Sequence, residues 1–129
     1  MSGSSMDGVD LACCEFTEEH SKWNFRILAA DTLPYPASLH KQLEDACTWN
    51  RKKIGELDHE LGNFYAGLLN EFHTLHGLLP DLISSHGHTI LHQPDQGITF
   101  QAGEGRIMSE RTGITVVNDF RSEDVAQGG

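Results

Sequence analysis

The chain has 129 residues, which is enough for one modest domain with a real hydrophobic core. Its 9 Lys and Arg residues stand against 19 Asp and Glu residues, giving a formal net charge of −10 at pH 7. Because so acidic a surface repels phosphate backbones and anionic lipids, the charge argues against nucleic acid and membranes as partners.

The opening residues, 1–10, form a predicted loop rich in glycine, serine and aspartate. Gly3 and Gly8 bracket two serines and Asp7, and glycine reaches positive φ without a Cβ penalty, so the amides can turn inward around an anion. The serine hydroxyls add donors for phosphate oxygens, and Asp7 or Asp10 offers oxygen to a magnesium ion. The same composition is also ordinary turn chemistry, so the loop alone leaves a simple hairpin turn open.

Two antiparallel strands are expected next, over residues 8–16 and 22–32, with a polar turn between them. In the second strand Trp23, Phe25 and Ile27 occupy alternate positions, which is typical of a half-buried strand.

Two helices follow, over residues 38–49 and 53–76. In the second helix apolar residues recur every three or four positions and therefore share one face. That face contains Ile54, Leu57, Leu61, Phe64, Leu68, Phe72 and Leu75. Gly77 is placed to end the helix.

The rest of the chain alternates short strands with one short helix. Strands are predicted at residues 81–85, 90–92, 98–101 and 114–117, and a helix at 105–112 with Gly113 as its C-terminal glycine. This order of elements indicates a mixed α/β fold. Polar clusters follow strands at residues 85–89 and 119–124, and we expect them to share one rim of a sheet with the opening loop.

The three cysteines, Cys13, Cys14 and Cys47, show no C-x-x-C spacing. Adjacent positions 13 and 14 point to opposite faces of a strand, so reduced thiols in a cytoplasmic protein are favoured. The sequence shows no charged-then-apolar leader and no apolar run near eighteen residues, which indicates neither export nor a membrane span.

Three histidines raise the question of a metal site. His86 and His88 would share one face of a strand, and His92 follows four residues later. However, Gly87 indicates a turn between the first two, and no Cys or acid recurs nearby at ligand spacing. Histidines that are satisfied internally or that face a substrate are therefore favoured over a structural metal.

Arg121 is one of few cations in an acidic neighbourhood. One interpretation is an ion pair with Asp119 or Asp124 that holds the local turn. The other is a guanidinium fork that binds a ligand carboxylate. The spacing alone leaves both open.

Four segments taken together resemble the anhydro-N-acetylmuramic acid kinase family, within the actin-like sugar-kinase and Hsp70 superfamily. They are SGSSMDGVD at 2–10, SHGHT at 85–89, ITVVNDFRSED at 114–124 and the closing Gly128-Gly129. The family usually has Thr at Ser5, Gln at His88 and Ile at Ala102, so these positions depart from its pattern.

The resemblance implies an actin-like (ribonuclease H-like) α/β lobe with a mixed sheet and flanking helices. Residues 1–129 would form one partial N-terminal lobe, about a third of such an enzyme. On this reading the strand before the phosphate loop and the C-terminal lobe are missing, so we expect in-frame coding sequence on both sides and a piece inactive alone.

The implied reaction transfers the ATP γ-phosphoryl group to the 6-oxygen of 1,6-anhydro-N-acetylmuramic acid. Water opens the anhydro ring in the same process and gives N-acetylmuramic acid 6-phosphate, a step of peptidoglycan recycling in the cytoplasm. The resemblance places the catalytic base beyond Gly129 and leaves a homodimer of the full-length enzyme open.

The resemblance also implies roles for single residues. Those implied to bind ATP are Gly3, Ser4, Ser5, Met6, Asp7, Gly8, Val9 and Asp10. Asp7 and Asp10 would hold Mg²⁺, and His86, Gln101, Asp119 and Arg121 would bind the sugar. Two alternatives stay open: a non-catalytic half-lobe that acts as a binding piece, and another sugar kinase of the superfamily, against which the Asp-Phe-Arg block argues.

Overall fold

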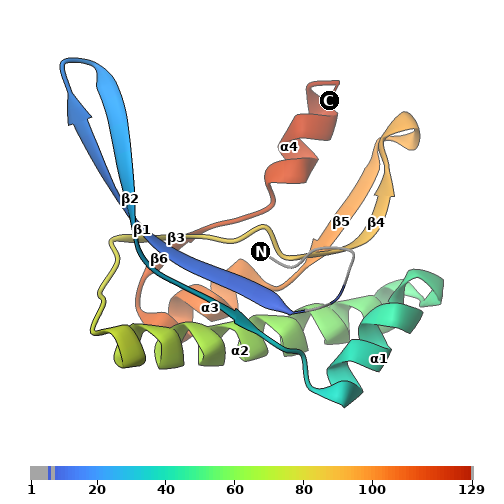
Figure 1. Cartoon of the computed structure of the whole chain (residues 1–129). Helices are drawn as coiled ribbons and strands as arrows, with labels where there is room; N and C mark the ends of the chain where they lie inside the picture. The colour runs from blue at the N-terminus through green and yellow to red at the C-terminus, as the bar shows by residue number, and fades with distance from the viewer. Residues whose placement is uncertain (1–5, 7, 129) are drawn as a thin grey trace.

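The computed structural model describes residue 6 and residues 8–128 of the chain. Its strands are β1 (Val9–Glu19), β2 (Lys22–Leu33), β3 (Leu82–Ser84), β4 (His88–Gln93), β5 (Ile98–Ala102) and β6 (Thr115–Val117). Its α-helices are α1 (Ala37–Asp45), α2 (Arg51–His76), α3 (Gly105–Thr112) and α4 (Phe120–Ala126), with short 3-10 turns at Ala46–Thr48 and Pro94–Gln96. Figure 1 shows α2 along one side of the molecule with the strands across it.

The long helix α2 forms largely as its sequence predicts. The Asn50 side chain accepts a hydrogen bond from the Lys53 N–H at 3.0 Å, so the helix begins at Arg51, two residues before the expected start. Gly77 ends it in the left-handed conformation at φ 63°. Ile54, Leu57, Leu61 and Phe72 of the expected apolar face are buried. Phe64 and Leu68 are partly buried, and Leu75, at the end of the helix, is 73% exposed.

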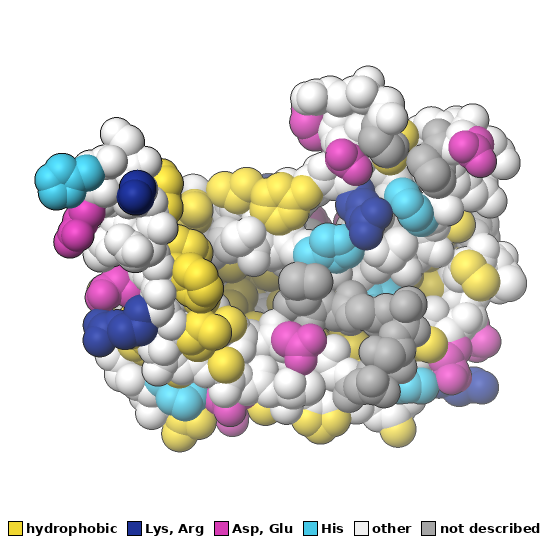
Figure 2. Space-filling view, turned by 45° about the horizontal axis from the view of Figure 1, so that its top comes forward, with side chains coloured by type: hydrophobic (Ala, Val, Ile, Leu, Met, Phe, Trp, Pro, Cys, Tyr) yellow, Lys and Arg dark blue, Asp and Glu magenta, His cyan; other side chains and the backbone are white. Residues whose placement is uncertain are grey.

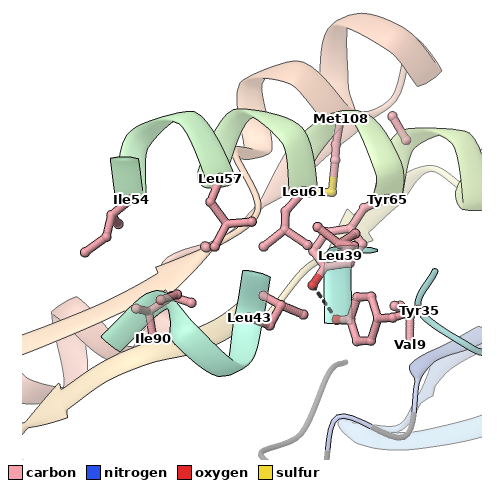
Figure 3. Close-up of a cluster of buried hydrophobic side chains, with 13 residues drawn as sticks. Val9, Tyr35, Leu39, Leu43, Ile54, Leu57, Leu61, Tyr65, Ile90 and Met108 are labelled. Atoms are coloured by element: carbon pink, nitrogen blue, oxygen red, sulfur yellow. Dashed lines mark hydrogen bonds between the residues drawn. The ribbon is translucent and has the colours of Figure 1, made fainter. Parts of the chain in front are cut away.

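The core lies where α2 faces α1 and β4, as Figure 3 shows. Leu57 and Leu61 of α2 and Met108 of α3 are the largest fully buried side chains among the described residues. Beside them the hydroxyls of Tyr35 and Tyr65 share a buried hydrogen bond of 2.8 Å. The core therefore pairs apolar packing with a satisfied polar contact.

The first hairpin is longer than the sequence predicts. β1 and β2 pair from Val9↔Leu33 to Glu19↔Lys22, with a register shift between Cys13 and Cys14. The expected turn at residues 17–21 shrinks to His20 and Ser21, which both have positive φ (51° and 62°), the backbone of a tight two-residue turn. The outer half projects from the body (Figure 1).

The other strands pair in two short ladders. β3 and β6 are parallel, with Ile83 opposite Val116, and β4 and β5 are antiparallel. Together with the helices they confirm a mixed α/β fold. No helix in the described ranges is long and apolar enough to cross a membrane.

The sequence pattern does not predict the helix α4, since it indicates only a polar cluster at residues 119–124. The residue before it, Asp119, adopts a left-handed conformation at φ 61°. None of its seven residues is buried, and its sequence, FRSEDVA, has no apolar residues at helical spacing by which a pattern could reveal it.

Candidate functional site

Two of the three polar clusters meet at one edge of the β3–β6 pair. Ser84 lies opposite Val117 in the parallel register, so residues 85–89 and 118–124 leave the strands on the same side. This confirms the expected shared rim for these two clusters. Most of the third cluster, the opening loop, lies outside the described residues.

Arg121 is held between two imidazoles at this rim. Its Nε donates to His86 Nε2 at 3.3 Å, and one terminal nitrogen lies 3.4 Å from His92 Nε2. The side chain comes from α4, while the histidines come from the β3–β4 connection and from β4. In Figure 2 the Arg and His colours gather at the foot of the two projections on one side of the molecule.

The hydrogen bonds around the imidazoles assign their tautomers. Each Nδ1 faces an oxygen, Gly87 O at 3.2 Å for His86 and Thr99 Oγ1 at 3.3 Å for His92. Because each Nε2 accepts from Arg121, each Nδ1 carries the proton and both rings are neutral in this arrangement. The rings therefore orient the guanidinium without neutralising its charge.

No carboxylate within residues 8–128 forms a salt bridge with Arg121. Asp119 instead accepts a 2.6 Å hydrogen bond from the Ser122 hydroxyl. The interpretation of Arg121 as the ion-pair partner of this turn is therefore wrong. In addition, the described part of the chain holds no group of three or more His, Cys, Asp or Glu side chains that could bind a metal ion.

Gln101 extends the same network. Its Nε2 donates to Thr99 Oγ1 at 2.8 Å, and Thr99 is the residue that faces His92. Its Oε1 is buried and has no hydrogen-bond partner in the described ranges. A buried acceptor without a partner carries a desolvation cost of about 1–3 kcal/mol, which a ligand donor would remove.

A small polar cavity of about 350 Å³ lies beside Gln101. Its lining includes Asp119 and Ser122 from the rim, and Asp58 from α2. Burial raises the pKa of Asp58, and the N–H of Gly103, which donates to it at 2.7 Å, acts in the opposite direction. The cavity is thus lined by hydrogen-bonding groups that suit a hydroxylated ligand.

The structure brings His86, Gln101, Asp119 and Arg121 to one region, and adds His92 and Asp58. The sequence indicates His92 only as a possible metal ligand. Its distance in sequence from Arg121 does not indicate that the two side chains meet. Asp58 follows Leu57 on a regular amphipathic helix, where a charged residue normally indicates a solvated face.

His88 lies under the site rather than in it. It is buried, and its ring meets Tyr35 edge-on at 6.2 Å between centroids. Burial, with His86 nearby, lowers the pKa of His88. The departure from the family pattern at this position therefore lies at a buried position.

Gly87 explains why His86 and His88, only two positions apart, lie in different environments. Its φ is 69°, and a Cβ there would lie 2.6 Å from the carbonyl oxygen of Ala102. Only glycine fits this backbone conformation. The change of direction at Gly87 places His88 in the core and leaves His86 at the rim.

Gly3, Ser4, Ser5 and Asp7 of the expected ATP loop lie outside the described residues. Met6 has a positive φ of 53°. Gly8 does not, and is required instead because a Cβ would lie 2.6 Å from the Leu33 carbonyl oxygen. The Val9 side chain is buried in the core, and Asp10 Oδ1 accepts from the Thr32 hydroxyl at 2.7 Å.

Comparison with known proteins gives one consistent result. A family model described as anhydro-N-acetylmuramic acid kinase matches residues 1–129. Proteins of that name from Vibrio parahaemolyticus, Vibrio vulnificus strain YJ016 and Pasteurella multocida are 41%, 42% and 37% identical to this chain. Each match covers 100% of this chain but only 35–36% of the relative, so the chain spans about a third of their length.

Proposed function

The chain belongs to the anhydro-N-acetylmuramic acid kinase family, and from this premise we propose that it supplies part of an ATP-dependent kinase of that sugar. Residues 1–129 would be a partial N-terminal lobe of actin-like, ribonuclease H-like architecture. The parallel β3–β6 pair, the helix α3 beside it and the helix α2 packed on α3 support this assignment.

The proposed reaction moves the ATP γ-phosphoryl group to the 6-oxygen of 1,6-anhydro-N-acetylmuramic acid. Water adds to the anomeric carbon as the anhydro bridge opens, and the product is N-acetylmuramic acid 6-phosphate. Such a step belongs to peptidoglycan recycling in the cytoplasm. Phosphoryl transfer depends mainly on positioning and on stabilisation of charge, which a loop of amides and hydroxyls supplies.

We assign the ATP phosphates to the loop at residues 3–10 on the family resemblance. Among its described residues, Asp10 fits a magnesium ion best, since its carboxylate is exposed and carboxylate oxygens are ligands that Mg²⁺ prefers. A bound magnesium ion would neutralise charge on the phosphates. The buried Val9 side chain leaves only its backbone for contact with a nucleotide.

The sugar's lactyl carboxylate is assigned to Arg121. The observation that carries this assignment is a guanidinium fixed by the neutral rings of His86 and His92, with no described carboxylate in a salt bridge to it. An oriented fork of unneutralised charge suits a bidentate carboxylate contact, in which two parallel N–H···O bonds form.

The neighbouring cavity is assigned to polar groups of the same sugar. The Gln101 Oε1 would accept a hydrogen bond from a hydroxyl or acetamide N–H, and Asp119 would accept another. No carboxylate of this chain is assigned as the base that activates water. That base would come from the rest of the longer protein, which would also decide whether it dimerises.

The assignment of Arg121 is tested by Arg121→Lys in a longer kinase that carries this chain as its N-terminal part. Lysine keeps the charge but loses the fork, so the affinity for the anhydro sugar should fall by about 1.5–3 kcal/mol, roughly ten- to a hundredfold. ATP affinity and the melting temperature should barely change.

The matched control is Arg26→Lys, which makes the same change at an exposed arginine paired with Glu15 on the first hairpin. This variant should retain both ligands. Loss of stability and of both ligands by Arg121→Lys would show that Arg121 holds the rim together and that the sugar's carboxylate binds elsewhere.

A further inference from the structure

Asp58 contacts the turn between β5 and α3 with both its side chain and its backbone. Its Oδ1 accepts a hydrogen bond of 2.7 Å from the Gly103 N–H, and its carbonyl oxygen accepts one of 3.3 Å from the Glu104 N–H. The turn thus lies against α2, which Figure 1 shows beside α3. Because the carboxylate is held through one oxygen, the direction of its second oxygen is restricted as well.

The surroundings of this contact are closely packed. One turn further along α2, a Cβ at Gly62 would lie 2.9 Å from the Glu104 carbonyl oxygen. Leu57 and Leu61, which precede Asp58 and Gly62, are fully buried in the core. Asp58 therefore lies on a rigid element, which positions a binding group more precisely than a loop does.

The second carboxylate oxygen, Oδ2, makes no hydrogen bond with the described residues. Asp58 is half-buried, and it lines the polar cavity of about 350 Å³ beside Gln101. Burial raises the pKa of Asp58, because the charged form has lost part of its hydration. A donor group of a ligand in the cavity would replace that lost hydration.

The other acceptors of this cavity differ from Asp58. Gln101 Oε1 is neutral, and neutral acceptors form weaker hydrogen bonds than carboxylates. Asp119 is exposed to water, and Glu104 forms a salt bridge with Arg106 at 2.9 Å. Among the described residues, Asp58 is therefore the half-buried carboxylate of the cavity that has no salt bridge.

We propose that Asp58 is a further binding residue for the anhydro sugar, an inference that rests on the proposed function. Its Oδ2 accepts a hydrogen bond from a donor group of the sugar, while the Gly103 N–H orients the carboxylate through Oδ1. The sugar carries such donors on both carbons that flank C3, the 4-hydroxyl and the N–H of the 2-acetamide. Since C3 bears the lactyl group assigned to Arg121, either donor can reach the neighbouring cavity.

Asp58→Asn tests this contact in a longer kinase that carries this chain as its N-terminal part. The amide keeps an oxygen for the Gly103 N–H but places an NH₂ donor where Oδ2 accepts. By calorimetry, the affinity for the anhydro sugar should fall at least about tenfold, whereas ATP affinity and the melting temperature should barely change. The matched control is Glu56→Gln, which removes the same charge at an exposed α2 residue paired with Lys52 and should retain the sugar affinity.

Two analogues of the sugar identify the donor. In one, fluorine replaces the 4-hydroxyl and cannot donate. In the other, an acetoxy group replaces the acetamide and lacks its N–H. Wild type should bind one of these analogues at least about tenfold more weakly than the parent sugar, and Asp58→Asn should distinguish that analogue from the parent far less.

A second measurement uses the wild-type kinase and does not depend on the folding of a variant. Carbon NMR of labelled aspartate follows the titration of the Asp58 carboxyl group. Because a hydrogen bond to the charged form favours that form, the pKa of Asp58 should be lower with the parent sugar than with the analogue that lacks the donor.

Three results would overturn the inference. One is wild type that binds both analogues as tightly as the parent sugar. The second is Asp58→Asn that distinguishes the analogues as fully as wild type does. The third is a pKa of Asp58 that is the same with all three ligands, which would make Asp58 only a structural anchor of the turn. Failure of wild type to bind the sugar at all would instead refute the proposed function, and this inference with it.

Discussion

The two antiparallel hairpins differ in what their side chains contact. On β1–β2, Phe16, Trp23 and Phe25 are 63–69% exposed, and the hairpin's outer half stands away from the body. On β4–β5, Ile90 and Ala102 enter the core, while Gln101 turns polar groups toward the rim. The first hairpin thus presents apolar surface suited to a protein neighbour, and the second presents hydrogen-bonding groups suited to a small ligand.

This difference shows that alternating apolar and polar residues predict a strand but do not predict that its apolar side chains are buried. Trp23, Phe25 and Ile27 do occupy alternate positions of β2, as expected, yet none is buried in this chain. Burial depends on a surface that meets the strand face. The helices α1 and α2 supply one for the second hairpin, but for the first hairpin only at its inner end, where Val9 is buried (Figure 3).

The largest expected effect is on the second hairpin. Ile90→Ala removes a core side chain that packs between β4 and the helices, and should lower the free energy of unfolding by about 2–4 kcal/mol. Urea denaturation followed by circular dichroism measures this. A loss below about 1 kcal/mol would mean that β4 is not anchored in the core as described.

A smaller effect concerns pH. Because burial lowers the pKa of His88 in the folded chain, the unfolded chain binds that proton at higher pH. The free energy of unfolding should therefore fall as the pH drops below about 6.5, the usual histidine value. Burial lowers the pKa of His73 too, so part of the fall belongs to that residue.

His88→Gln separates the two contributions. Glutamine does not titrate, so this variant should lose part of the pH dependence between about pH 6.5 and 5 when urea denaturation is repeated across that range. An unchanged slope would show that His88 titrates alike in the folded and unfolded states.

The smallest effect is on the first hairpin. Phe25→Ala removes an exposed ring that contacts only Phe16 among the aromatic side chains described, so the free energy of unfolding should change by less than about 0.5 kcal/mol. Urea denaturation followed by circular dichroism measures this change as well. A cost comparable with that of Ile90→Ala would mean that the two hairpins do not differ as the structure indicates.

Local patterns predicted the local features of the fold. The period of α2, the span of α3 and the left-handed Gly113 were all confirmed, because periodicity and capping depend on neighbours within a few residues. The bulge at Cys13 and Cys14 and the helix α4 were missed, because neither leaves a periodic signal.

The candidate site shows the same limit. Family motifs pointed to His86 and Arg121, but their contact joins residues 35 apart in the chain, and the contact with His92 joins residues 29 apart. The parallel pairing of β3 and β6 brings His86 and Arg121 to one edge, and β4 adds His92. Asp58 lies on a different element again, so no spacing rule could have connected it with Gln101.

The most direct test of the proposed carboxylate assignment is a binding cycle by calorimetry, in a longer kinase that carries this chain as its N-terminal part. Two ligands are compared, the anhydro-muramic sugar and the same sugar with its carboxylate converted to a carboxamide, on wild type and Arg121→Lys. Wild type should lose about ten- to a hundredfold in affinity for the amide, and the variant should lose far less, because the fork is already gone. Equal losses in both proteins would show that another group binds the carboxylate.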